Sequence, residues 1–180
     1  DVRYSIVRYI ASDRRNAQGP RVADPRTGEI IESDVLWYHN HLQSYRNRYL
    51  IETGAANPAA RTLNTPIEDI GEMMRQVIAH EVGHSLGLRH NFKASSAYPV
   101  DSLRSATFTQ KMGLATSLMD YTRYNYVAQP GDEGVRFVRQ MGPYDLYSIE
   151  WGYRYFPEQS PIEIRKSLKK WVDEKSTDPI

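Results

Sequence analysis

The run from His80 to His90 reads HEVGHSLGLRH, and it constrains the fold of this chain more than any other segment. In a helix, His80 and His84 lie one turn apart on the same face, so both imidazoles can reach one metal ion while Glu81 projects beside them. A residue six positions after His84 would lie on another face of that helix. The backbone must therefore turn back, and Gly87 supplies the left-handed conformation that ends a helix at low cost.

These residue types are the ones that a catalytic zinc site needs. Three neutral imidazoles, from His80, His84 and His90, leave one position of a tetrahedral zinc ion open for water. One such ion lowers the pKa of the water to about 7 and polarises a substrate carbonyl. Glu81 is then the predicted general base, which accepts a proton and returns it to the departing amine. The alternatives are ordinary helix-face histidines and a Glu81 that only forms a helix salt bridge.

A helix start precedes the motif at 65–68, where a threonine N-cap, a proline and a glutamate three residues after the cap combine. We expect the helix to run from there to Gly87, about six turns. Its expected apolar face consists of Ile67, Ile70, Met73, Met74, Val77 and Ile78. Gly83 costs about 1 kcal/mol in a helix relative to alanine, which suggests the close approach of another backbone segment.

The remaining elements are predicted from periodicity and turn residues. Strands are expected over residues 2–10, 21–23 and 30–38, with a turn at 24–28 that joins the last two as a hairpin. Helices are expected over 41–52 and 143–151, and from Ser160 onward, where the cap, proline and glutamate signature recurs. Between residues 91 and about 128 the pattern is irregular, apart from a short helix indicated from Asp101.

The segment from His80 to His90 resembles the signature of the metzincin metallopeptidases, which pair it with a methionine turn beneath the zinc site. Ser117-Leu118-Met119-Asp120-Tyr121 is similar to that turn, with Met119 as the hydrophobic base under the histidines. A methionine there could also be ordinary core filler. Some metzincins carry a tyrosine near the metal where Tyr121 stands, which implies a metal ligand or a transition-state donor. Because the chain has thirteen tyrosines, a role of Tyr121 outside metal binding and catalysis stays open.

The chain is also similar to a largely uncharacterised bacterial group of zinc-dependent metzincin-like proteins, at His90-Asn91, at the 24–28 turn and over 91–105. The resemblance implies an α+β, two-lobed domain. Its upper lobe, about 1–87, would hold a small twisted mixed sheet and the active-site helix, and its irregular lower lobe, about 88–180, would end in a C-terminal helix.

The same resemblance implies that a substrate binds as an extended strand along a sheet edge, for which Arg21–Asp24 is the candidate. The predicted helix at 41–52 is a departure, because a minimal metzincin has only a loop between its last strand and the active-site helix. This departure puts the correspondence of the strands, and therefore the docking edge, in question.

Composition narrows the class of function. The 23 basic and 22 acidic residues are spread along the chain, so no basic stripe indicates nucleic acid or an anionic membrane. No segment approaches the roughly 18 apolar residues of a membrane span. Cysteine is absent, which leaves histidine as the expected nitrogen or sulfur ligand. Because the chain starts at Asp1 without a signal-peptide pattern, we expect one catalytic domain, 1–180, excised from a longer precursor.

Two other groups of residues could bind metal. His39 and His41 could hold a metal ion from one side of a strand, but a polar strand end entering a helix explains them equally well. Asp132 and Glu133 could hold calcium, as some metzincins do, although two carboxylates in a Gly-flanked loop more often form a solvated turn. Calcium is therefore possible, and no ligand is assigned to it.

The leading hypothesis is a zinc endopeptidase that hydrolyses peptide bonds in a protein or peptide substrate through metal-activated water. The resemblance implies an extracytoplasmic location, whether periplasmic, at the cell surface or secreted. Two alternatives stay open: a non-catalytic zinc-containing binding module, and a zinc amidohydrolase that acts on a non-protein amide.

Overall fold

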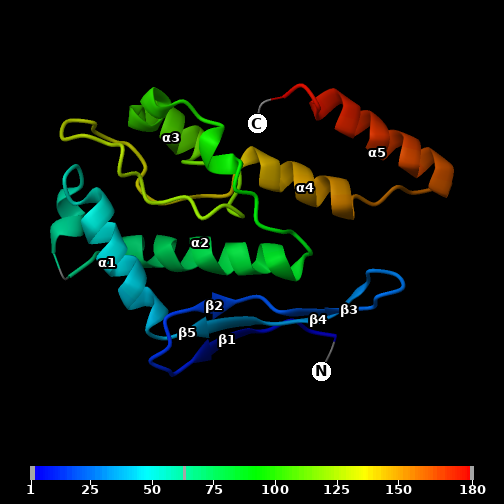
Figure 1. Cartoon of the computed structure of the whole chain (residues 1–180), viewed down its shortest axis with the longest axis horizontal. Helices are drawn as coiled ribbons and strands as arrows, with labels where there is room; N and C mark the ends of the chain where they lie inside the picture. Colours follow the sequence, from blue (N-terminus) through cyan, green and yellow to red (C-terminus); the bar gives the residue numbers. More distant parts are fainter. Residues whose placement is uncertain (1–2, 63, 179–180) are drawn as a thin grey trace.

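The computed structural model describes residues 3–62 and 64–178 of the chain. Its elements are β1 (Val7–Ile10), β2 (Ala17–Gln18), β3 (Arg21–Ala23), β4 (Ile30–Ser33), β5 (Val35–Tyr38), α1 (His41–Thr53), α2 (Ile67–Ser85), α3 (Ala106–Met112), α4 (Pro143–Tyr153) and α5 (Pro161–Lys175). Short 3-10 helices span Pro58–Arg61, Ala94–Ser96 and Val100–Arg104. Figure 1 shows α2 between the strands and the segments that contain α3 and α4. This is the mixed α+β fold that the sequence predicts.

The main sheet has the order β1-β5-β2, in which β1 runs parallel to β5 and β2 runs antiparallel to it. It is therefore the small mixed sheet that was expected. β3 and β4 pair separately as the predicted antiparallel hairpin. In its turn, the Gly28 N–H donates to the Asp24 carbonyl at 2.8 Å, and Gly28 takes a φ of +77°, a conformation that glycine adopts without strain.

The strands are shorter than predicted. The expected strand over 30–38 is broken at Asp34, whose carboxylate accepts hydrogen bonds from the Ile6 N–H at 2.9 Å and from Arg8 Nε at 2.8 Å. These two bonds separate β4 from β5. The predicted strand over 2–10 forms only at Val7–Ile10, and its first residue, position 2, lies outside the described residues. β2 was not predicted, because two residues show no periodicity.

The helix that carries His80 and His84, α2, has 19 residues, about five turns rather than six. Its start differs from the prediction, because the N-cap is Pro66 and no side chain caps the helix, so Thr65 does not form the expected capping box. The prediction of its apolar face is correct in the middle of the helix, where Met73 and Val77 are buried. It is wrong at the N-terminal end, where Ile67 is 72% exposed.

Two buried clusters hold α2 in place. One contains Tyr49, Ala60, Met73, Tyr124 and Val138. The other contains Ala17, Trp37 and Val77. Tyr45 of α1 packs against both clusters, so the helix that departs from a minimal metzincin is part of the support of α2. Burial of such aromatic and aliphatic side chains is the main source of folding free energy.

The C-terminal helices follow their sequence signals closely. In α5, the Ser160 hydroxyl accepts from the Glu163 N–H, and the Glu163 carboxylate accepts from the Ser160 N–H, as a capping box requires. The helix indicated from Asp101 is a 3-10 helix, and α3, capped by Ser105, follows it. Among the described residues, no helix is both long enough and apolar enough to cross a membrane.

The two capping signals should differ in their effect on stability. We expect Ser160→Ala to destabilise α5 by about 1 kcal/mol and to speed hydrogen exchange of its backbone amides about fivefold. Thr65→Ala removes the same kind of signal from α2, where no side-chain cap forms, so exchange in α2 should stay almost unchanged. Exchange mass spectrometry on both variants checks this, and equal effects at the two helices would contradict the assignment of the caps.

Candidate metal centre

The turn after α2 brings the third histidine back toward the helix. Gly87 has a φ of +95°, its N–H donates to the His84 carbonyl at 3.0 Å, and the Leu88 N–H donates to the Gly83 carbonyl at 2.9 Å. These bonds satisfy carbonyls at the end of α2 and reverse the chain direction. The predicted helix-ending role of Gly87 is confirmed.

The imidazoles of His80, His84 and His90 converge on one point. His90 Nε2 lies 3.2 Å from His80 Nε2 and 3.0 Å from His84 Nε2. Within the described ranges, these three residues are the one group of three or more potential metal-ligating side chains that could hold an ion. His80 is buried, His84 is partly buried and His90 is exposed, so the group opens to solvent on one side.

The other ring nitrogens orient two of these imidazoles. His80 Nδ1 lies 2.6 Å from the Leu118 carbonyl oxygen, and His84 Nδ1 lies 2.9 Å from the Leu88 carbonyl oxygen. A carbonyl only accepts, so each Nδ1 carries a proton and donates it, and in the neutral form of the ring Nε2 is left with the lone pair that a metal ion needs. Burial lowers the pKa of His80 to about 4, which keeps its ring neutral near pH 7.

This geometry fits a zinc ion. Lone pairs that face one another repel unless a cation lies between them. At a Zn–N distance of about 2.0–2.1 Å, tetrahedral coordination separates two nitrogen ligands by about 3.4 Å, close to the Nε2 separations found for His90. Main-chain carbonyls that accept from the other ring nitrogen, and so orient ligating histidines, are also typical of metal sites.

Glu81 is buried one residue beyond His80, under the chain that enters β3. Burial raises the pKa of its carboxyl group, and the hydrogen bond from the Gly19 N–H opposes that rise. Gly19 itself rests on the helix, because a Cβ at this position would lie 2.4 Å from the Glu81 carbonyl oxygen. A carboxyl group with a raised pKa is better suited to accept and return a proton.

Met119 lies buried directly beside Gly83 of α2. A Cβ at Gly83 would lie 2.5 Å from Met119 Sδ, so only glycine leaves room for this side chain. The sequence predicted a close approach at Gly83 but assigned it to a backbone segment, which is wrong: the close neighbour is the thioether of Met119. The methionine therefore packs against the helix that carries two of the histidines, and its role as a base under a metal site stays a prediction.

The segment around Met119 is anchored by Asp145 of α4. The Asp145 carboxylate accepts hydrogen bonds from the Ser117 hydroxyl at 2.5 Å, the Leu118 N–H at 2.8 Å and the Gly142 N–H at 2.9 Å. The same Leu118 residue offers its carbonyl to His80. Charge-assisted bonds of this kind are about twice as strong as neutral ones, so α4 fixes the main chain at Leu118, whose carbonyl orients His80.

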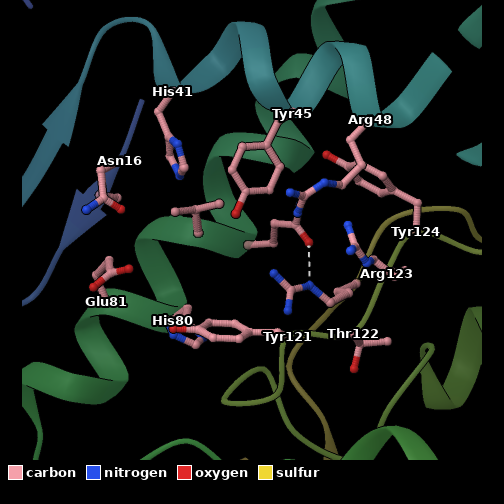
Figure 2. Close-up of a pocket in the computed structure, with 14 residues that line it drawn as sticks. Asn16, His41, Tyr45, Arg48, His80, Glu81, Tyr121, Thr122, Arg123 and Tyr124 are labelled. Atoms are coloured by element: carbon pink, nitrogen blue, oxygen red, sulfur yellow. Dashed lines mark hydrogen bonds between the residues drawn. The ribbon is translucent and has the colours of Figure 1, made fainter. Parts of the chain in front are cut away.

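Tyr121 lies against the histidines, although its side chain is largely exposed. Its ring centroid is 4.4 Å from that of His90 and 5.7 Å from that of His80, and Figure 2 shows it alongside His80. Burial and the nearby Glu81 carboxylate raise the pKa of Tyr121, so its hydroxyl stays protonated at neutral pH. The structure thus brings the predicted tyrosine to the site.

The weaker metal candidates take part in other contacts. The ring of His41 packs edge-on against Trp37 and Tyr45, whereas His39 contacts the Tyr9 hydroxyl. Asp132 binds Arg104 through both carboxylate oxygens, at 2.8 and 2.9 Å. The guanidinium of Arg104 therefore balances the charge of this carboxylate without a metal ion. Neither pair belongs to a metal-binding group among the described residues.

A small mixed sheet, three convergent histidines of which the third follows a glycine turn, and a buried methionine define the metzincin class of domain. A family model described as Met-zincin matches residues 62–180, which include α2 and every element after it. The chain therefore belongs to the Met-zincin family. Comparison with the curated proteins and with the solved structures found no match.

Sequence reasoning missed the residues that support the site. Asp145 is the third residue after the Gly142 N-cap of α4, where an acidic residue indicates a helix start. That signal does not indicate the hydrogen bonds of Asp145 to Ser117 and Leu118. Gly19 stands in a turn-prone stretch and gave no sign that it packs on Glu81. Both depend on contacts between distant segments, which local patterns do not report.

The contact between Gly83 and Met119 can be tested by a double-mutant cycle. Gly83→Ala should destabilise the fold by about 1–3 kcal/mol, because the new methyl group would overlap the sulfur. Met119→Ala should relieve that overlap, so the double variant should be more stable than the sum of the two losses by about 1 kcal/mol or more. Urea unfolding measures each term.

Gly71→Ala is the matched control, since it lies in the same helix and its Cβ would meet nothing within 4 Å. This control should be stabilising by up to about 1 kcal/mol, as expected for alanine in a helix. If Gly83→Ala behaved like Gly71→Ala, the close packing of Met119 would be wrong.

Asp145→Asn should weaken both the fold and metal binding. The NH2 group of the asparagine would face at least one of the three hydrogen-bond donors. We therefore expect a loss of about 2–3 kcal/mol in the free energy of unfolding, together with a lower affinity for zinc. Glu150→Gln, an exposed change in the same helix, should stay within about 0.5 kcal/mol of the wild type. Denaturant unfolding and zinc titration against a chelating dye check both effects.

Proposed function

We propose that this domain is a zinc-dependent endopeptidase that acts on a protein or peptide substrate outside the cytoplasm. The observation that carries the proposal is the convergence of three imidazole Nε2 atoms beside the buried Glu81 carboxyl group. Membership of the Met-zincin family supports it and is also the basis for the proposed location. The open side of the histidine group leaves room for a reacting carbonyl.

In this proposal His80, His84 and His90 are the metal ligands, and zinc, when bound, supplies a polarised carbonyl and an activated water. Glu81 accepts the proton of that water at its carboxylate and then delivers it to the nitrogen of the departing amine. Its burial favours both steps, because the raised pKa brings the carboxyl group closer to the working pH. Tyr121 donates its hydroxyl proton as a hydrogen bond to the developing oxyanion.

The substrate would lie along the chain from β2 to β3, which passes over the end of α2. Gly19 hydrogen-bonds to Glu81, and Arg21 Nη1 donates to the His84 carbonyl at 2.9 Å. β2 pairs with β5 on one side, and no other described strand pairs with it, which supports an exposed edge for an extended peptide. This assignment extends the docking edge expected at Arg21–Asp24 toward β2.

Replacing the general base separates metal binding from catalysis. Glu81→Gln should retain one zinc ion and lose peptide hydrolysis by roughly a hundredfold to ten-thousandfold, because only proton transfer is removed. Metal analysis and chelator-sensitive cleavage of an unbiased peptide library measure the two effects. Glu68→Gln, in the first turn of the same helix, should leave both unchanged.

Full activity of the Glu81→Gln variant would exclude Glu81 as the general base. A zinc-loaded wild type that cleaves no peptide would exclude the endopeptidase assignment and favour either a binding module or an amidohydrolase for a different amide.

A further inference from the structure

A cavity of about 360 Å³ lies beside His80 and Glu81 and is not used by the chemistry proposed above. α1 forms one wall, through Tyr45 and Arg48, and residues 121–124 form another. Figure 2 shows the Tyr45 hydroxyl directed into this space, with Arg48 on one side and Glu81 across from it. A substrate held at the histidines would therefore have a side-chain pocket next to the bond that is cleaved.

Arg139 is the least expected residue in this cavity, because it is charged and only 7% exposed. Its Nε donates to Gln76 Oε1 at 2.9 Å, the bond drawn as a dashed line in Figure 2, and its Nη1 donates to the main-chain carbonyl of Asp120. Both acceptors are neutral. Within the part of the chain that the structure describes, Arg139 forms no ion pair, and its Nη2 has no acceptor.

The Asp120 carboxylate forms no ion pair with Arg139 among the described residues. The Asp120 carboxylate attracts it at longer range, but Asp120 Oδ2 accepts its own hydrogen bond from the Ser95 N–H at 2.7 Å. A buried guanidinium without a contacting carboxylate is costly, since burial penalises its charge. The two neutral acceptors fix the orientation of the guanidinium and leave its Nη2 atom available to a ligand.

The rest of the cavity also consists mainly of donors and positive charge. Arg48 and Arg123 line it and share one carboxylate, since Arg48 Nε lies 3.9 Å and Arg123 Nη1 lies 3.1 Å from the same oxygen of Glu52. The Tyr124 hydroxyl is buried without a partner. Glu81 is the single acidic residue among those that line the cavity. The lining therefore matches a carboxylate, which only accepts hydrogen bonds and carries the opposite charge.

We propose that this cavity binds the carboxylate of an aspartate or glutamate side chain next to the scissile bond, with Arg139 as its buried partner and Arg48 at its rim. The proposal rests on the endopeptidase function proposed above and names the substrate class of the same site. A peptide's C-terminal carboxylate offers the same chemistry, but a cavity of about 360 Å³ has room for a whole side chain and not only for the end of a backbone.

The test compares two pools of octapeptides that are identical except for one fixed central position, which holds Glu in one pool and Gln in the other. Both pools are acetylated and amidated, so no terminal carboxylate is present. We expect the Glu pool to be cleaved with a kcat/KM about tenfold higher or more, with cuts adjacent to the fixed position. We also expect the zinc-loaded Glu81→Gln variant to bind the Glu pool more tightly by a similar factor, measured by fluorescence anisotropy.

Two variants locate the preference. Arg48→Gln, at the half-exposed rim, should keep the fold and reduce the preference for Glu over Gln severalfold. Arg139→Met, which keeps an unbranched apolar stem and removes the guanidinium with its charge, should abolish the preference, with far-UV circular dichroism as the check on folding. Lys170→Gln makes the same charge change on the exposed face of α5 and should leave the preference intact.

Equal cleavage of the two pools by an active wild type would overturn the acidic-side-chain proposal and leave the endopeptidase function standing. A preference that survives Arg48→Gln and a folded Arg139→Met would also overturn it. If only peptides with a free C-terminal carboxylate were bound, the ligand would be the chain end instead. Tighter binding of the Glu pool without any cleavage would support the pocket and contradict the endopeptidase function.

Discussion

The Asp145 carboxylate is the contact on which the geometry of the metal centre depends. It binds the main chain beside Met119, and that same stretch offers the Leu118 carbonyl to His80. The Met119 carbonyl in turn accepts from the Asn91 N–H, one residue after the third histidine. One buried carboxylate therefore connects α4 to the main chain that holds both His80 on the helix and the segment just after His90.

The site combines two opposite kinds of electrostatic environment. The three imidazoles turn their Nε2 atoms toward one another, an arrangement that suits a cation. The adjoining cavity, which is lined by Arg48, Arg123 and Arg139, suits an anion. Glu81 and His80 line this cavity too, and the carboxyl group of Glu81 is buried. A substrate whose carbonyl meets the first region and whose carboxylate meets the second would be oriented by charge as well as by shape.

The part of the fold that sequence could predict is the part that local signals encode. The spacing from His80 to His90, the left-handed glycine at Gly87 and the capping box at Ser160 each need only neighbouring residues, and each is found as predicted. The family model confirms the resemblance drawn from these residues over two thirds of the chain, though not over its strands. The roles of Glu81 and Tyr121 are not tested by this match and stay predictions.

What sequence could not predict depends on distant partners. The break in the predicted strand at Asp34 requires a hydrogen bond to a residue 28 positions earlier. The orientation of the Arg139 guanidinium requires an acceptor 63 positions away. The Thr65 signal failed for the opposite reason: its local pattern is correct, but the chain enters α2 through Pro66 without side-chain capping. Tertiary contacts thus decided where elements break and which polar side chains are buried.

The contact of Gly19 with the Glu81 carbonyl has a consequence for the shape of the cleft. Because backbone rests on backbone there, the spacing between the edge chain and the active-site helix cannot be adjusted by a change of rotamer. The opposite wall, at 121–124, consists of side chains on irregular backbone. Main-chain contact therefore fixes the spacing of the edge chain, so differences in substrate choice within such a scaffold would come from the side chains that line the other walls.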